Sequence, residues 1–438
     1  MKKFIAVMIL GVLTLNVFSQ TNKIEFEEYD LDNGLHVILH QDRSTPIVAV
    51  TVTYHVGAKN EKPDRTGFAH FFEHLMFEGT KNIDRGEYAE IVEKAGGSLN
   101  ANTTSDRTYY YELLPSNQLE LGLWLESERM LHAKVDSLGI ATQKNVVIEE
   151  YKQNYENQPY GTILIETSKR AYEEHPYRWT TIGDPEHIRA AKDEEFQEFY
   201  DMFYVPNNAV LTIAGDIDID ETKKMIEKYY AGIPKGKNEI YRPTVNEPLK
   251  NKEIRDTVYD NIQLPAVIQA YHLPAMGTDD YYAVDMLSTL LSRGESSRLY
   301  KTLVDEKQLA LFAASFPLPY EDPGLALTYS IPNVNVDPAE LEDAMNKEIE
   351  KVRNDYISDQ ELEKVKNQIE SQFVNSNTTL ANRAYNMAIN YTFFKNTNLV
   401  NTEIEKYMAV TKDDIKRVAN KYFRDDNRVV LYYLPKKN

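Results

Sequence analysis

Length, composition and charge already narrow what this chain can be. Its 438 residues exceed one ordinary hydrophobic core, so we expect two or more domains. A formal net charge of −19 would repel a phosphate backbone and argues against nucleic-acid binding. The absence of cysteine excludes disulfide scaffolds, thiolate metal sites and cysteine nucleophiles, so any metal must be held by histidine and carboxylate side chains.

Residues 1–20, MKKFIAVMILGVLTLNVFSQ, have the layout of a secretory signal peptide. Lys2 and Lys3 precede an apolar stretch from Phe4 to Phe18, and Ser19 is a small residue near a plausible cleavage point. The apolar stretch is short for a membrane anchor, and no cysteine could carry a lipid. We therefore expect an exported protein without a stable membrane anchor, either periplasmic or secreted.

Strands and helices alternate along the rest of the chain. Two extended runs around Asn33-Gly34 predict a β-hairpin, and 46–58 reads as a buried strand. A helix follows, with Thr66 as the expected N-cap and Gly79 just past its end. Further elements are expected as strands over 95–115 and 208–218, and as helices over 116–132, 137–157 and 220–230. This mixture predicts the α+β class.

The segment 232–250 is rich in Pro, Gly and Lys, lacks apolar periodicity and is the expected linker. It suggests an N-terminal domain over 21–232, a linker over 233–250 and a C-terminal domain over 251–438. The pair Tyr54-His55 recurs as Tyr271-His272, 217 residues later, in similar strand patterns. We therefore expect two homologous domains, each a mixed sheet packed with helices.

The sequence GFAHFFEHLMFEGT places two histidines and a glutamate on one helical segment. Positions i and i+4 lie on one face of a helix with i+3 beside them, so His70 and His74 can aim at one point next to Glu73. Two neutral imidazoles suit Zn²⁺, and a carboxylate between them can accept a proton from water. The alternative is a packed helix with two partly exposed histidines. The same offset of 217 places Leu287, Leu290 and Leu291 at the corresponding positions of the second half.

This H-x-x-E-H spacing resembles that of the inverted-zincin metallopeptidases related to pitrilysin, insulin-degrading enzyme and mitochondrial processing peptidase. The resemblance covers essentially the whole chain after residue 20 and is strongest to the short bacterial members with two homologous α+β domains. It implies one zinc ion per chain, with Glu73 as general base. In that family the third ligand is a glutamate about 76 residues after the second histidine, which corresponds to Glu150; Glu149 is the rival. A supporting glutamate usually lies seven residues earlier, where this chain has Gln143.

The segment GGSLNANTTSDRTYYY resembles the edge strand that receives the substrate peptide in this family. An extended peptide can add to an unpaired strand edge through backbone hydrogen bonds with little sequence preference. The resemblance implies Ser98, Asn100 and Ala101 as substrate-binding residues. The alternative is an ordinary strand without a binding role.

The resemblance also indicates that the second half lacks two residues that the family usually has there. The family's C-terminal domain usually supplies an Arg and a Tyr, seven residues apart, which bind the substrate carbonyl and stabilise the developing oxyanion. Aligning Arg298-Leu299-Tyr300 with the preceding family segment places Val304 and Leu311 at these two positions. The chain is therefore similar to the zinc-bearing subunit of a heterodimer whose homologous partner carries the Arg/Tyr pair.

The sequence favours a zinc-dependent endopeptidase that hydrolyses short or unfolded peptides. The alternative from another class is a non-catalytic structural or peptide-binding subunit of the same fold. Retention of His70, Glu73 and His74 with a correctly spaced glutamate argues against that alternative.

Overall fold

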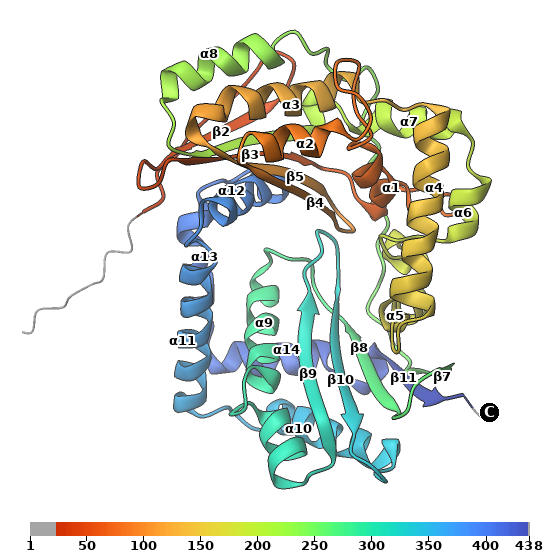
Figure 1. Cartoon of the computed structure of the whole chain (residues 1–438). Coiled ribbons are helices and arrows are strands. Elements are labelled where there is room, and N and C mark those ends of the chain that lie inside the picture. Colours follow the sequence, from red (N-terminus) through yellow and green to blue (C-terminus); the bar gives the residue numbers. More distant parts are fainter. Residues whose placement is uncertain (1–22, 437–438) are drawn as a thin grey trace, which may run out of the picture.

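The computed structural model describes residues 23–436 and contains two β-sheets covered by helices (Figure 1). The predicted signal peptide lies outside the described residues. The first sheet has the strand order β1-β2-β6-β3-β5-β4 and the second has the order β7-β11-β8-β10-β9. The strands are β1 (Glu27–Asp30), β2 (His36–Gln41), β3 (Ile47–Tyr54), β4 (Ser98–Thr103), β5 (Thr108–Pro115), β6 (Ala209–Gly215), β7 (Ile254–Asp260), β8 (Ala266–His272), β9 (Ala310–Leu318), β10 (Leu325–Pro332) and β11 (Arg428–Pro435).

The two sheets repeat one topology, which confirms the predicted pair of homologous α+β units. In each sheet one parallel pair, β2–β6 or β7–β11, is followed by three strands that pair antiparallel. The repeat extends to single contacts. The Asn208 side-chain amide donates to the carbonyl oxygen of His55 at 3.3 Å, and Asn427 donates to that of His272 at 3.0 Å.

Helices connect the strands in both halves. The first half contains α1 (Phe68–Leu75), α2 (Glu87–Lys94), α3 (Leu119–His132), α4 (Ser137–Tyr151), α5 (Ile163–Ala171), α6 (Pro185–Ala190), α7 (Asp193–Phe203) and α8 (Ile219–Tyr230). The second half contains α9 (Asp279–Ser292), α10 (Pro338–Asn354), α11 (Asp359–Asn375), α12 (Leu380–Phe394), α13 (Leu399–Ala409) and α14 (Lys412–Tyr422). By position and order, α9 corresponds to α1 and α11 to α4.

The two halves exchange one helix each. Helix α5 of the first half packs on the second sheet, where Ile163 and Leu164 join the core around Ile268. Helix α12 of the second half packs on the first sheet, where Met387 contributes to the core around Val210. Each sheet therefore covers part of its apolar face with a helix from the other half, and the two halves are interlocked.

Residues 233–250 lead from α8, the last helix of the first half, toward β7, the first strand of the second half, and form no helix or strand. We propose this segment as the linker between units 21–232 and 251–438. Within the described residues, the structure contains no helix with the length and apolarity that crossing a bilayer requires.

Candidate active site

Helix α1 begins at a buried carboxylate contributed by a preceding loop. The prediction that Thr66 is the N-cap is wrong, because Gly67 occupies the cap position with φ +91°. The Thr66 hydroxyl instead lies 2.8 Å from Nδ1 of His187. Glu61 accepts hydrogen bonds of 2.8 Å from the backbone N–H groups of Gly67 and Ala69. Because the first N–H groups of a helix lack partners within it, the Glu61 side chain satisfies two of them. Burial raises the pKa of Glu61 to about 8, while the hydrogen bonds from the two N–H groups oppose the rise.

The apolar face of α1 fixes the direction of its polar face. Phe68, Phe71 and Phe72 are buried against α7, with the ring centroids of Phe68 and Phe196 4.5 Å apart. This packing turns the opposite face, which carries His70, Glu73 and His74, toward α4 and β4.

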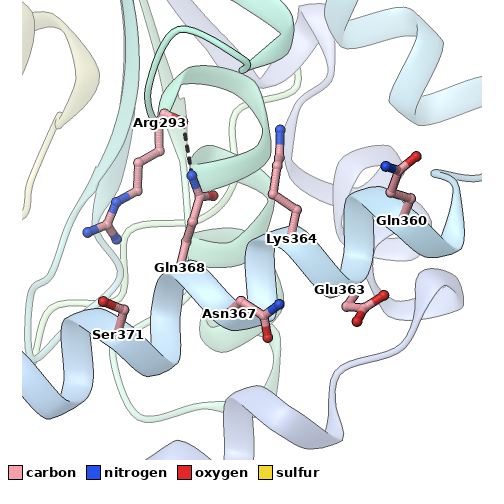
Figure 2. A pocket seen from close by; sticks show the side chains of 7 residues that line it. All are labelled: Arg293, Gln360, Glu363, Lys364, Asn367, Gln368 and Ser371. Atoms are coloured by element: carbon pink, nitrogen blue, oxygen red, sulfur yellow. Dashed lines mark hydrogen bonds between the residues drawn. The ribbon is translucent and has the colours of Figure 1, made fainter.

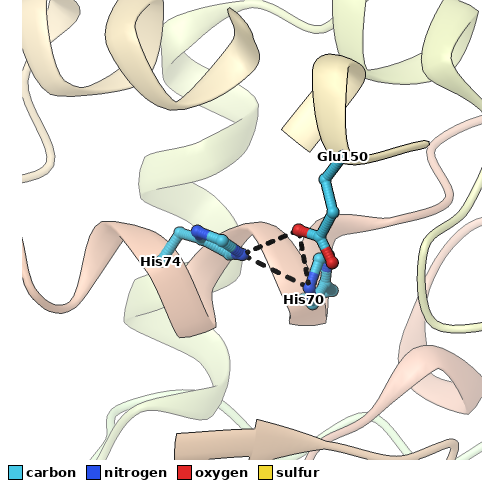
Figure 3. A group of neighbouring side chains, drawn as sticks. All are labelled: His70, His74 and Glu150. Atoms are coloured by element: carbon cyan, nitrogen blue, oxygen red, sulfur yellow. Dashed lines mark hydrogen bonds and ion pairs between the residues drawn. The ribbon is translucent and has the colours of Figure 1, made fainter. Parts of the chain in front are cut away.

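Helix α4 brings Glu150 to the two histidines (Figure 3). The Nε2 atoms of His70 and His74 are 3.3 Å apart, and Oε2 of Glu150 lies 3.6 Å from the first and 3.3 Å from the second. The neighbouring Glu149 is exposed and pairs with Lys152 at 3.4 Å. Of the two rival glutamates, the structure therefore places Glu150 beside the histidines.

The three ligand atoms have the spacing that a tetrahedral metal requires. Metal–ligand bonds of about 2.0–2.1 Å place two ligands of a tetrahedron about 3.3–3.4 Å apart. The three observed separations of 3.3, 3.3 and 3.6 Å match that edge length closely. Two imidazoles and one carboxylate are also the donor types of a catalytic zinc site with one open position. Among residues 23–436, this is the one group of three or more potential ligands close enough to hold a metal.

The protonation states also suit a cation. Burial, followed by the neighbouring His74, lowers the pKa of His70 to about 4, so its imidazole is neutral at physiological pH. A hydrogen bond with His74 lowers the pKa of Glu150 and keeps its carboxylate ionised. The site thus offers a neutral imidazole at His70 and one negative charge at Glu150.

Glu73 lies on the same face of α1 but is not part of the three-residue group. Burial raises the pKa of Glu73, while a hydrogen bond from Thr103 opposes the rise. The Thr103 hydroxyl donates to Oε2 of Glu73 at 2.6 Å. A carboxylate made more basic by burial, adjacent to a metal site, can accept a proton from water.

Strand β4 is the outer strand of the first sheet and lies beside α1 (Figure 1). Within the described residues it pairs only with β5, so its other edge is open. Of the predicted substrate-binding residues, Ser98 and Asn100 are exposed, whereas Ala101 is 8% exposed and packs in the core. The strand has the free edge that β-augmentation needs.

Gln143 does not contact the three-residue group but ties α4 to the turn that follows α1. Its side-chain amide donates to Oε1 of Glu78 at 2.6 Å, and Oε2 of Glu78 pairs with Arg85 at 2.6 Å. Gln143 therefore has the carboxylate of Glu78 as its hydrogen-bond acceptor, and an amide at position 143 can donate to it.

The second half contains no comparable chemistry among its described residues. Leu287, Leu290 and Leu291 are buried in the second core. Leu311 is exposed on β9, Val304 packs against the core, and Arg298 pairs with Glu361 at 2.8 Å. Neither Val304 nor Leu311 has a side chain that can donate a hydrogen bond to an oxyanion.

A surface hollow of about 500 Å³ lies along α11, the counterpart of α4 (Figure 2). Two of its lining residues are hydrogen-bonded to each other: the Gln368 amide donates to the carbonyl oxygen of Arg293 at 3.4 Å. Its described lining includes one carboxylate and no histidine, so it lacks the ligands of a zinc site. The lining residues are Arg293, Gln360, Glu363, Lys364, Asn367, Gln368 and Ser371.

Sequence models of one peptidase family match both halves of the chain. The model described as "Insulinase (Peptidase family M16)" matches residues 36–184. The model described as "Peptidase M16 inactive domain" matches residues 191–369. The first match includes His70, His74 and Glu150. The second match begins within the first half, at residue 191, and includes Leu287, Leu290 and Leu291.

Individual relatives agree with these matches. The chain is 29% identical to "Zinc protease PqqE" of Helicobacter pylori over 98% of its own length and 97% of that protein's. It is 25% identical to a mitochondrial-processing peptidase subunit beta of Lentinula edodes over 92% of its length and 89% of the relative's. The crystal structure of a protease from Helicobacter pylori superposes with a TM-score of 0.90 at 29% identity, covering 94% of this chain and all of that one.

Proposed function

Since the chain belongs to the M16 peptidase family, we propose that it is a zinc-dependent endopeptidase that hydrolyses short or unfolded peptides. The observation that carries this proposal is the tetrahedral spacing of His70, His74 and Glu150, with Glu73 on the adjacent helix position. These three side chains would hold the metal through two nitrogens and one oxygen.

The division of labour among the residues follows from their chemistry. His70, His74 and Glu150 would hold a zinc ion, which would supply Lewis acidity and lower the pKa of bound water toward neutrality. Glu73 accepts the proton of the attacking water and delivers it to the leaving amine. The open edge of β4, with Ser98, Asn100 and Ala101, holds the peptide in an extended form, which selects unfolded segments over folded proteins.

Oxyanion stabilisation needs donors that this chain does not offer at positions 304 and 311. We propose that a homologous subunit supplies an Arg and a Tyr, so that the working enzyme is a heterodimer. The relative from Lentinula edodes, itself named as a beta subunit, is consistent with this arrangement. We also propose export to the periplasm or the medium, because residues 1–20 have the layout of a signal peptide.

The test compares wild type with Glu73→Gln, each with and without the homologous subunit, for cleavage of an unstructured peptide and for bound zinc. We expect both proteins to retain zinc, while Glu73→Gln lowers kcat at least about 100-fold because the base is lost. Equal cleavage by the two proteins would contradict the role of Glu73. Zinc binding without cleavage in any assembly would instead favour a non-catalytic subunit.

A further inference from the structure

We propose that Thr103 is a positioning residue that orients the Glu73 carboxylate and couples it to the strand that receives the peptide. The inference rests on the proposed peptidase function and adds a residue to it. Sequence patterns did not single out Thr103, but its contact with Glu73 is among the shortest polar contacts of the site, at 2.6 Å.

The hydrogen bond decides how Glu73 presents its two oxygens. The Thr103 hydroxyl donates to Oε2, and no other group within residues 23–436 donates a hydrogen bond to this carboxylate. The last torsion of a glutamate side chain is soft, so a single short bond selects its orientation. With Oε2 occupied, Oε1 remains free to accept a proton.

Thr103 is also part of the proposed peptide-binding strand. It is the last residue of β4 and pairs with Thr108 of β5. Alternation along the strand places its side chain on the face of Leu99 and Ala101, which pack into the core beside α1. The open edge of β4 and the hydroxyl that holds Glu73 therefore belong to one rigid element.

The end of β4 is braced from the second half. Arg107 donates to the carbonyl oxygen of Asn102 at 2.8 Å and to the hydroxyl of Tyr385, on α12, at 2.9 Å. The strand cannot shift without disturbing these contacts. A peptide added to its edge thus meets a carboxylate whose position relative to that edge is fixed, and misplacements near 1 Å cost about 100-fold in rate.

The test uses two substitutions at position 103 and one control. Thr103→Val keeps the branched shape but removes the hydroxyl, whereas Thr103→Ser keeps the hydroxyl. Thr402→Val is the control, because the Thr402 hydroxyl donates to the carbonyl oxygen of Asn398 at the start of α13 in the second half. We would measure kcat, KM, bound zinc and the unfolding temperature in the assembly that cleaves peptide.

For Thr103→Val we expect kcat to fall about 10- to 100-fold, with KM, zinc content and unfolding temperature close to wild type. Thr103→Ser and Thr402→Val should stay within about threefold of wild type. Full activity of Thr103→Val, or equal losses in the Val and Ser variants, would overturn the inference while leaving the peptidase function intact. A wild-type protein that binds zinc and cleaves nothing would overturn the proposed function itself, and the inference with it.

Discussion

Glu149 and Glu150 are neighbours on α4, yet their surroundings differ in kind. Glu150 lies 3.3 and 3.6 Å from the two histidine Nε2 atoms, while Glu149 faces solvent beside Lys152. One turn of the helix cannot point both side chains at the same site, because consecutive residues are separated by about 100° around the axis. Only one of the two can therefore take the proposed ligand role.

This contrast gives a matched pair of variants. Glu150→Gln should lower zinc affinity at least about 100-fold, since even supporting residues of metal sites cost about 10- to 100-fold when removed. Glu149→Gln removes the same charge from the same turn and should leave zinc affinity within about threefold. Competition with a chromogenic chelator measures both. Similar losses in the two variants would show that the net charge of the turn, rather than coordination, holds the metal.

The contact between Gln143 and Glu78 allows a second test of α4. Gln143→Glu would place a second carboxylate within hydrogen-bonding distance of Glu78, whose Oε1 now accepts the amide. The pKa of the new carboxyl would be raised, so its cost should appear as pH rises above about 5 and reach about 1–3 kcal/mol of unfolding free energy at pH 8.

The control for this substitution adds one charge elsewhere on the same helix. Asn145→Asp lies on the exposed face of α4 and should change stability by less than about 0.5 kcal/mol. Denaturant unfolding at pH 5 and pH 8 gives the comparison. A Gln143→Glu protein as stable as Asn145→Asp at pH 8 would contradict the account of this contact.

At the scale of elements, α1 depends on Glu61, which takes the place of an ordinary N-cap side chain. Glu61→Ala removes the acceptor for two backbone N–H groups and should cost about 1–2 kcal/mol of stability. Because α1 carries two of the proposed ligands, zinc affinity should fall as well. Asp218→Ala removes the cap of α8, far from the site, and should cost similar stability with unchanged zinc affinity. Equal zinc affinities in the two variants would show that Glu61 does not influence the metal site.

The elements also indicate what the sequence could and could not predict. The hairpin at Asn33-Gly34, strands β3 and β6 and the repeated topology follow from local patterns of period two and from turn residues. The convergence of His70 and His74 follows from helix geometry. Thr103 was missed, although strand alternation from Ala101 reaches it two residues later. Glu61 was missed because its bonds to α1 depend on the path of a loop, which no periodicity encodes.

The exchange of α5 and α12 between the sheets belongs to the whole molecule and has no local signature. Both helices are amphipathic, but nothing in their sequences specifies which sheet they cover. A group of charges at the junction of the halves adds to this interlocking. Lys59 of the first half lies 2.6 Å from Glu321 and 3.0 Å from Asp322 of the β9–β10 turn, and His55 lies 2.9 Å from Glu321.

This junction should make the assembly of the two halves sensitive to acid. Burial opposes ionisation of Glu321, but the bonds from His55 and Lys59 prevail and lower its pKa to about 2. A depressed carboxyl pKa gives stability that is present above about pH 4.5 and is lost as pH falls toward 2. Glu321→Gln should therefore show a smaller fall in unfolding temperature between pH 5 and pH 3 than wild type. An unchanged acid dependence would mean that Glu321 does not link the halves energetically.

We propose above that one zinc ion, held by His70, His74 and Glu150, makes this chain a peptidase. The most direct measurement follows cleavage of an unstructured peptide while zinc is titrated into the chelator-treated protein, assembled with its homologous subunit. We expect no cleavage without zinc and a rise in cleavage that saturates at one zinc per chain. Glu73→Gln should bind the same amount of zinc without cleaving the peptide. Cleavage that persists without zinc, or that is as fast in Glu73→Gln, would contradict this proposal.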